Sequence, residues 1–182
     1  MANTHRYTTL AIALHWTVAA LIFSAFPLGL YMSDLKLSPL KLQLVSYHKW
    51  LGVTILLLVL IRLAWRATHT PPALPASIAA WQQRAAHALH HLLYVLMLGI
   101  PVSGWLMSSA KGVPVVYLGL LKLPDLVGKN KALGNALETL HASLNYTLLA
   151  LVLLHIAAAL KHQFLDRDDT LSRMLPFLER KP

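Results

Sequence analysis

The sequence predicts an all-α integral membrane protein, a four-helix bundle formed by one domain that spans residues 1–182. Of the 182 residues, 57% are hydrophobic and 13% are charged, and the mean hydropathy is +0.56. These values are far from those of a soluble domain, and the length leaves no room for a second domain. Four apolar runs are long enough to cross a hydrocarbon core, which takes roughly 20 helical residues.

The four expected helices follow these apolar runs. They span about residues 10–31, 46–65, 79–109 and 135–165. The first run resembles a signal peptide, but no small-residue cleavage site follows it and His15 lies inside it, so we keep it in the mature protein. Four crossings place both termini on one side of the membrane.

Polar or proline-rich connections separate the helices. Residues 32–45 form a short loop, and residues 67–78 contain three prolines, which cannot continue a helix. The third connection, 111–134, is the longest, and its apolar part 113–123 is expected to lie in the membrane interface. A charged tail, 166–182, closes the chain.

The net charge of +9 has a topological explanation. Lysines and arginines lie in short segments beside the apolar runs, and no basic stripe with interleaved aromatics is present, so we exclude a nucleic-acid partner. The arginines all fall on the side of the termini: Arg6, Arg62, Arg66, Arg84, Arg167, Arg173 and Arg180. When lysines are included, nine positive charges lie on the side of the termini and seven on the other side. This excess favours termini in the cytoplasm.

Four histidines inside the apolar runs give the main functional hypothesis. His141 and His155 are fourteen residues apart, nearly four helical turns, so they leave one helix face about 21 Å apart along the axis. An imidazole in hydrocarbon is costly unless it has a function. By depth, His15 matches His155 and His48 matches His141, which is what two bis-histidine haems in the bundle core require.

The absence of cysteine restricts the type of haem. Iron–sulfur clusters, disulfides and covalent c-type attachment are all excluded, so the haems would be of b type. Two axial imidazoles would leave no open position on the iron, so we expect electron transfer and assign no catalytic residue. A competing ligand set is His87, His90 and His91, but these lie beside Gln82, Gln83 and Arg84, which is typical of the headgroup level.

Helical phase adds three further candidates for cofactor binding. Gly29 lies fourteen residues beyond His15, and Arg62 fourteen beyond His48, so each shares a face with its histidine at the level of the other haem. Gly29 would leave space for a porphyrin, and Arg62 would direct its guanidinium at a propionate. Gly52, one turn beyond His48, would thin the wall of the site.

These residues resemble the bacterial cytochrome b561 family of small quinone-linked di-haem membrane proteins. The similarity covers nearly the whole chain and is carried by His15-Trp16, His48, residues 86–90, the His141 and His155 pair, and tail residues 169–176. It implies a cytoplasmic-side haem between His15 and His155 and a periplasmic-side haem between His48 and His141. It also implies a location in the bacterial inner membrane.

The resemblance further implies an oxidoreductase that oxidises superoxide and reduces ubiquinone. His162, seven residues beyond His155, would hydrogen-bond the quinone. Lysines on the other side would steer a small anion: Lys36, Lys41, Lys49, Lys111, Lys122, Lys129 and Lys131.

Two alternatives remain open from the sequence. The chain would be a cytochrome b subunit that anchors a periplasmic dehydrogenase or hydrogenase and passes its electrons to quinone, without an enzymatic activity of its own. In the second alternative, the chain would be a channel or transporter that uses the histidines as a proton relay.

Overall fold

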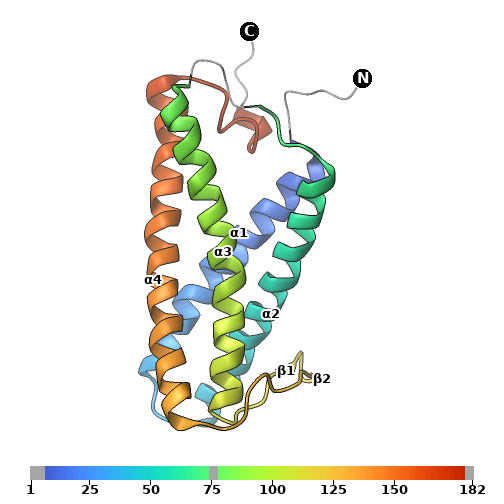
Figure 1. Cartoon of the computed structure of the whole chain (residues 1–182), viewed down its shortest axis with the longest axis vertical. Coiled ribbons are helices and arrows are strands. Elements are labelled where there is room, and N and C mark those ends of the chain that lie inside the picture. The colour runs from blue at the N-terminus through green and yellow to red at the C-terminus, as the bar shows by residue number, and fades with distance from the viewer. Residues whose placement is uncertain (1–6, 74–77, 179–182) are drawn as a thin grey trace.

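The computed structural model describes residues 7–73 and 78–178, and these form four long α-helices (Figure 1). Their bounds are α1 Thr9–Asp34, α2 Pro39–Thr68, α3 Ala80–Ala110 and α4 Lys131–Lys161. Each is long and apolar enough to cross a membrane, α4 together with the helical turn that follows it. The predicted all-α membrane bundle is therefore confirmed.

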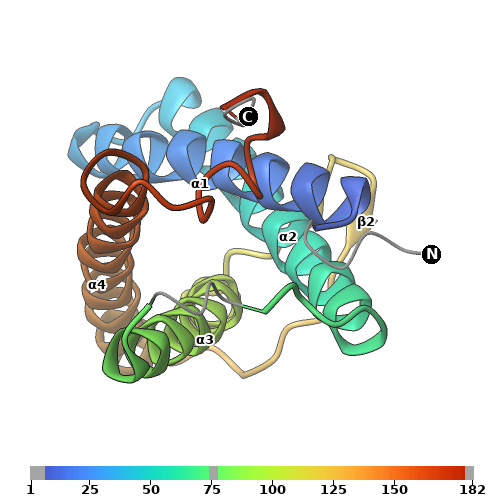
Figure 2. The ribbon, with the colours of Figure 1, turned by 90° about the horizontal axis from the view of Figure 1, so that it is seen from above.

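The helices follow one another in chain order around the axis of the bundle, as seen from above in Figure 2. Helix α3 packs against α4, α1 against α2, and α2 against α3. One core cluster is built on Val18, Ile55 and Val59, and a second on Leu93 with Leu148 and their neighbours. Many other large apolar side chains are exposed on the outside of the bundle, where lipid would cover them.

Two helices begin earlier than the apolar runs indicate. Helix α2 begins at Pro39 because Ser38 Oγ accepts a hydrogen bond from Lys41 N (3.2 Å), and Pro39 takes the first helical position. The prediction of a loop over residues 32–45 was therefore wrong. Helix α4 begins at Lys131 because the Asn130 side chain caps its first turn, accepting from Leu133 N at 3.0 Å.

The third connection contains a small hairpin, of strands β1 Val116–Tyr117 and β2 Leu121–Lys122. Two contacts tie it to α2. Trp50 Nε1 donates to Val116 O (2.7 Å), and the hydroxyls of Thr54 and Tyr117 are 3.0 Å apart. The expected interfacial segment 113–123 therefore includes a hairpin fixed to the side of α2 (Figure 1).

The C-terminal tail folds back over the end of the bundle that carries the start of α1 (Figure 2). It begins with a π-helical turn, His162–Asp166, and ends with a short 3₁₀ helix, Pro176–Leu178. Trp16 Nε1 donates to Met174 O at 2.9 Å, which joins the tail to α1. The start of α1 and the tail thus share one end of the bundle, while Arg6 and Arg180 lie outside the described residues.

Candidate functional site

Two pairs of imidazoles face each other inside the bundle at two different levels. The rings of His48 on α2 and His141 on α4 have centroids 6.2 Å apart at an interplanar angle of 82°. The rings of His15 on α1 and His155 on α4 have centroids 6.3 Å apart at 60°. Helix α4 therefore supplies one histidine to each pair, fourteen residues apart.

The ring separations fit a metal ion between each pair. A metal–imidazole bond is roughly 2 Å long, and a ring nitrogen lies about 1.1 Å from its ring centre, so two imidazoles on opposite sides of one ion have centres about 6.2 Å apart. The observed 6.2 and 6.3 Å match this value. All four side chains are partly buried, so each pair can hold the iron of a haem away from bulk water.

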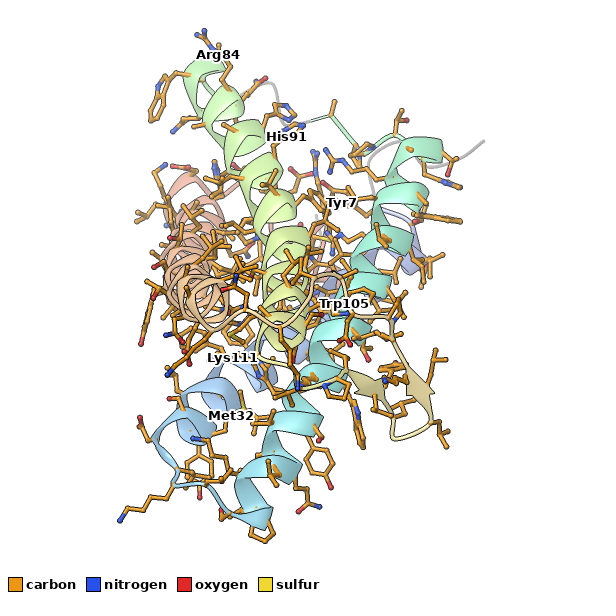
Figure 3. All side chains as sticks on the ribbon, turned by 60° about the horizontal axis from the view of Figure 1, so that its bottom comes forward. Tyr7, Met32, Arg84, His91, Trp105 and Lys111 are labelled. Atoms are coloured by element: carbon orange, nitrogen blue, oxygen red, sulfur yellow. The ribbon has the colours of Figure 1, made fainter. Side chains whose placement is uncertain are left out.

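His90 is the only histidine of the competing set that lies near either pair within the described residues. Its ring centroid is 5.3 Å from that of His155, at an interplanar angle of 74°. This separation is about 1 Å too short for two imidazoles on opposite sides of one ion. His87 and His91 are exposed, and His91 Nδ1 contacts His87 O along their own helix at 2.7 Å (Figure 3).

Backbone carbonyls orient both imidazoles of the His48/His141 pair. His48 Nδ1 is 3.2 Å from Ala25 O, and His141 Nδ1 is 3.1 Å from Ile100 O and 3.0 Å from Ser103 Oγ. Because a carbonyl only accepts, each Nδ1 carries the proton and donates it. The other nitrogen, Nε2, then has the lone pair that a metal ion needs.

A glycine makes each of these contacts possible. A Cβ on Gly29 would lie 3.1 Å from His48 Cε1, and a Cβ on Gly104 would lie 3.1 Å from His141 Cε1. Each glycine is four residues beyond the carbonyl that its histidine contacts, so the ring reaches that carbonyl across the missing side chain. The sequence predicted Gly29 at this level, but Gly104 was missed.

Cavities adjoin the His48/His141 pair. Two of them, of about 100 and 300 Å³, share both histidines and Gly52 in their walls. A Cβ on Gly52 would meet nothing within 4 Å, so this glycine borders open space.

A positive charge, that of Arg62, lies near the His15/His155 pair. Arg62 interacts electrostatically with both histidines, at the level that its helical phase indicates, and its contact with a haem propionate stays a prediction. Arg62 Nε donates to Tyr94 Oη at 2.9 Å, and the guanidinium carbons of Arg62 and Arg66 each lie 5.9 Å from the Tyr94 ring centre. The sequence indicated Arg62, but it gave no signal for the contribution of Tyr94.

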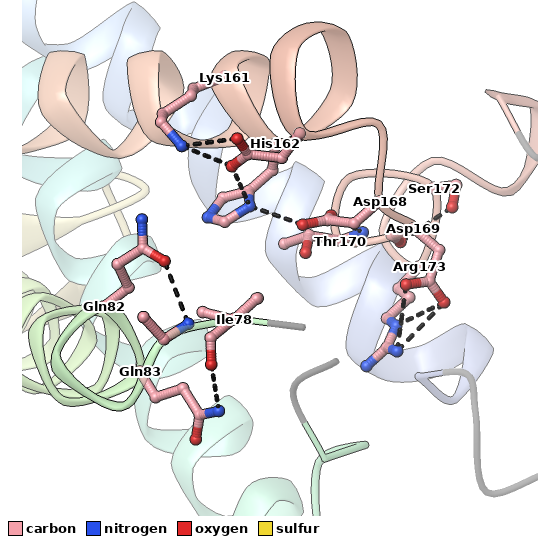
Figure 4. Close-up of polar contacts among 12 residues, drawn as sticks. Ile78, Gln82, Gln83, Lys161, His162, Asp168, Asp169, Thr170, Ser172 and Arg173 are labelled. Atoms are coloured by element: carbon pink, nitrogen blue, oxygen red, sulfur yellow. Dashed lines mark hydrogen bonds and ion pairs between the residues drawn. The ribbon is translucent and has the colours of Figure 1, made fainter. Parts of the chain in front are cut away.

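His162 has a well-defined environment in the structure. Its Nδ1 lies 2.7 Å from Asp168 Oδ2 and 3.1 Å from Asp166 Oδ2, at the end of α4 (Figure 4). The sequence predicted His162 near a quinone but did not indicate its carboxylate partners. Asp166 is four residues beyond His162 within the π-helical turn, whereas Asp168 becomes a neighbour because the chain reverses after this turn.

The comparisons with known proteins agree with this geometry. A sequence model of the family described as prokaryotic cytochrome b561 matches residues 6–177. The chain belongs to this family. The predicted resemblance is therefore confirmed, and the protein is a multi-pass membrane cytochrome that binds haem b.

Relatives of the cytochrome b561 chain are similar over nearly their whole length. The Escherichia coli (strain K12) protein named cytochrome b561 homolog 2 is 34% identical over 171 residues, which cover 93% of this chain and 91% of the relative. Cytochrome b561 homolog 1 of the same strain is 28% identical over 178 residues, covering 94% and 98%. A Yersinia pestis protein named probable superoxide oxidase CybB is 28% identical over 179 residues, covering 94% and 96%.

Proposed function

We propose that this cytochrome binds two haems b and carries electrons across the bacterial inner membrane to ubiquinone. One haem would lie between His48 and His141, and the other between His15 and His155. The observation that carries the proposal is the presence of two imidazole pairs with ring centroids 6.2 and 6.3 Å apart. Their α4 histidines are about 21 Å apart along the axis, so the pairs lie toward opposite faces of the membrane.

Each part of the bundle has a defined task in this proposal. A bound haem b supplies a one-electron change between ferric and ferrous iron. His48 with His141 would hold one haem iron, and His15 with His155 would hold the other. Arg62 and Arg66 would balance the charge of propionates, while the carbonyls of Ala25 and Ile100 keep the other two rings in one orientation.

We propose superoxide as the electron donor, at the end of the bundle that carries the hairpin. Support comes from the relative named probable superoxide oxidase and from the lysines of this end. Lys49 Nζ, however, donates to the carbonyls of Val113 (3.1 Å) and Pro114 (3.3 Å), so it ties the hairpin connection to α2. Lys111 is exposed but pairs with Glu138 at 2.7 Å, so the exposed lysines left for steering are Lys36, Lys122, Lys129 and Lys131.

We propose that ubiquinone is reduced at the opposite end, beside the His15/His155 pair and under the tail. The charge distribution of the sequence places this end, and both termini, in the cytoplasm. His162, the first residue after α4, lies at this end, and it would hydrogen-bond a quinone carbonyl.

Stopped-flow mixing tests the donor. The purified protein is mixed with superoxide, haem reduction is followed by absorbance, and ubiquinone is then added to reoxidise the haems. We expect the reduction rate to fall as added salt shortens the Debye length from roughly 30 Å at 0.01 M to 8 Å at 0.15 M. Lys129→Gln with Lys131→Gln should weaken this dependence, whereas Lys161→Gln, at the other end, should not.

Two results would separate the alternatives. If superoxide reduces wild-type protein no faster than a His48→Ala variant, the donor is a partner protein, as in a membrane anchor for a dehydrogenase. If the protein, expressed with ample haem, contains none, the haem proposal fails in favour of a proton relay.

A further inference from the structure

A carboxylate–imidazole cluster lies at the end of α4, apart from both histidine pairs. His162 Nδ1 is 2.7 Å from Asp168 Oδ2 and 3.1 Å from Asp166 Oδ2 (Figure 4). The side chains of His162 and Asp168 are only 16% and 11% exposed. The ring therefore donates its Nδ1 proton to a carboxylate in a partly buried, short contact.

Asp168 is itself held in place. Its Oδ1 accepts from Thr170 N at 2.9 Å, and its backbone N donates to His162 O at 3.1 Å. Burial raises the pKa of Asp168, but hydrogen bonds from Thr170 and His162 outweigh burial and hold the pKa below its ordinary value of 3.8. The carboxylate is therefore ionised at neutral pH and remains an acceptor.

The cluster lies between water and the His15/His155 pair. His162 is seven residues beyond His155, which is about 10 Å along a helix axis. The tail that follows it crosses the end of the bundle and reaches Met174, whose carbonyl is bound by Trp16 next to His15. A quinone beside this pair would therefore lie below the cluster.

The two carboxylates are the charged groups that contact His162. Lys161 Nζ pairs with Asp166 at 2.5 Å, so Asp166 is shared with a cation and Asp168 is the stronger partner of the ring. Other charged and titratable groups lie in the tail and on the neighbouring helices at this end. Within the described part of the chain, none of them forms an ion pair with His162: Asp169, Arg173, Arg62, Arg66, Arg84, His87, His90 and His91.

We infer that His162 donates a proton to the quinone and that Asp168 is the positioning residue that orients it. The inference rests on the proposed reduction of quinone at this end. Full reduction of a quinone takes two electrons, which arrive from the donor side, and two protons. For each proton, the Nε2–H bond of the imidazolium breaks, an O–H bond forms on the reduced quinone oxygen, and the ring regains a proton from water.

The geometry suits this role because the two ring nitrogens have different tasks. Nδ1 is held by Asp168, while Nε2 has no hydrogen-bond partner among residues 7–73 and 78–178 and points away from Asp168 in Figure 4. Because Nδ1 is held by a fixed carboxylate, the ring keeps the same orientation after each transfer. Asp166, which is 34% exposed, connects the cluster to water.

The test uses single-turnover oxidation of the pre-reduced holoprotein by a short-chain ubiquinone at a series of quinone concentrations. We expect Asp168→Asn to slow haem oxidation about 10- to 100-fold without changing the quinone concentration for half-maximal rate. A slower rate at an unchanged half-maximal quinone concentration separates proton delivery from quinone binding. Asp169→Asn is the matched control, since Asp169 pairs with Arg173 instead.

Three outcomes are distinguishable. A slower haem oxidation in Asp168→Asn at an unchanged half-maximal quinone concentration, partly restored in Asp168→Glu, supports the inference. If Asp168→Asn and His162→Gln both match Asp169→Asn while wild-type haems are oxidised by quinone, the inference is wrong and the proposed function stands. If quinone does not oxidise the wild-type haems at all, the proposed function fails and the inference fails with it.

Discussion

The two ends of the bundle hold their imidazole pairs in different ways. At the hairpin end, His48 and His141 are fixed by carbonyls on neighbouring helices and lie against Gly29 and Gly104. At the tail end, neither His15 nor His155 hydrogen-bonds to another described residue. Arg62 lies near that pair instead, and its guanidinium donates to Tyr94.

The difference shows that nearly the same separation between two imidazole rings is reached in two ways. Steric contacts fix the rings at the hairpin end, and a nearby charge acts on them at the tail end. Proline helps at the hairpin end, since Pro27 and Pro101 lie inside α1 and α3 close to the carbonyls that bind the two rings. Proline weakens the local helix and lets neighbouring groups approach the backbone. The hairpin end should therefore respond to changes of shape, and the tail end to changes of charge.

Adding a methyl group at Gly104 should give the largest effect. A Cβ there would lie 3.1 Å from His141 Cε1, so the ring or the helix must move, and such overpacking costs about 1–3 kcal/mol. We expect Gly104→Ala to lower the thermal unfolding midpoint and the haem occupancy of the hairpin end. Gly99→Ala is the control, since its Cβ would meet nothing within 4 Å. Equal behaviour of the two variants would contradict a steric role for Gly104.

Removing the Arg62 charge should have an intermediate effect, confined to the tail end. A nearby cation favours the reduced haem, so Arg62→Gln should lower one midpoint potential by tens of millivolts, since about 1 kcal/mol corresponds to roughly 40 mV for a one-electron couple. A redox titration followed by absorbance measures both potentials. Arg84→Gln serves as the control, because Arg84 is exposed. A shift of both potentials by the same amount would mean that Arg62 does not distinguish the two ends.

Acid should loosen the tail, with the smallest effect. Because the pKa of Asp168 is lower in the folded chain than its ordinary 3.8, its carboxylate stabilises the fold above about pH 4 and loses this contribution as the pH falls further. The unfolding midpoint of wild-type protein should therefore approach that of Asp168→Asn between about pH 5 and 3. A constant difference over this range would show that the ionised carboxylate does not stabilise the tail.

Periodicity explains how much of this architecture could be predicted from the sequence. The apolar runs predict the helices. The 3.6-residue repeat, together with the alternating direction of the crossings, predicts that His48 lies at the depth of His141 and His15 at the depth of His155. The start of α2 was placed seven residues late because Ser38 and Pro39 lie outside the apolar run, although together they are a strong helix-start signal.

The contacts of the site could not be predicted in the same way. Gly104 and Ser103 meet His141 only because of how α3 packs against α4, and the sequence does not give this rotation. Asp168 meets His162 because the chain reverses at Arg167, whose φ of 58° is left-handed. A single charged residue with positive φ has no reliable sequence signal.

The most direct test of the account is the haem content of single-histidine variants, measured against protein concentration and followed by absorbance. Wild type should bind about two low-spin haems b. His48→Ala and His141→Ala should each lose the same haem, His15→Ala and His155→Ala should each lose the other, and His90→Ala should keep both. Loss of a haem in His90→Ala, with both haems retained in His15→Ala, would contradict the pairing and assign the tail-end site to His90 and His155.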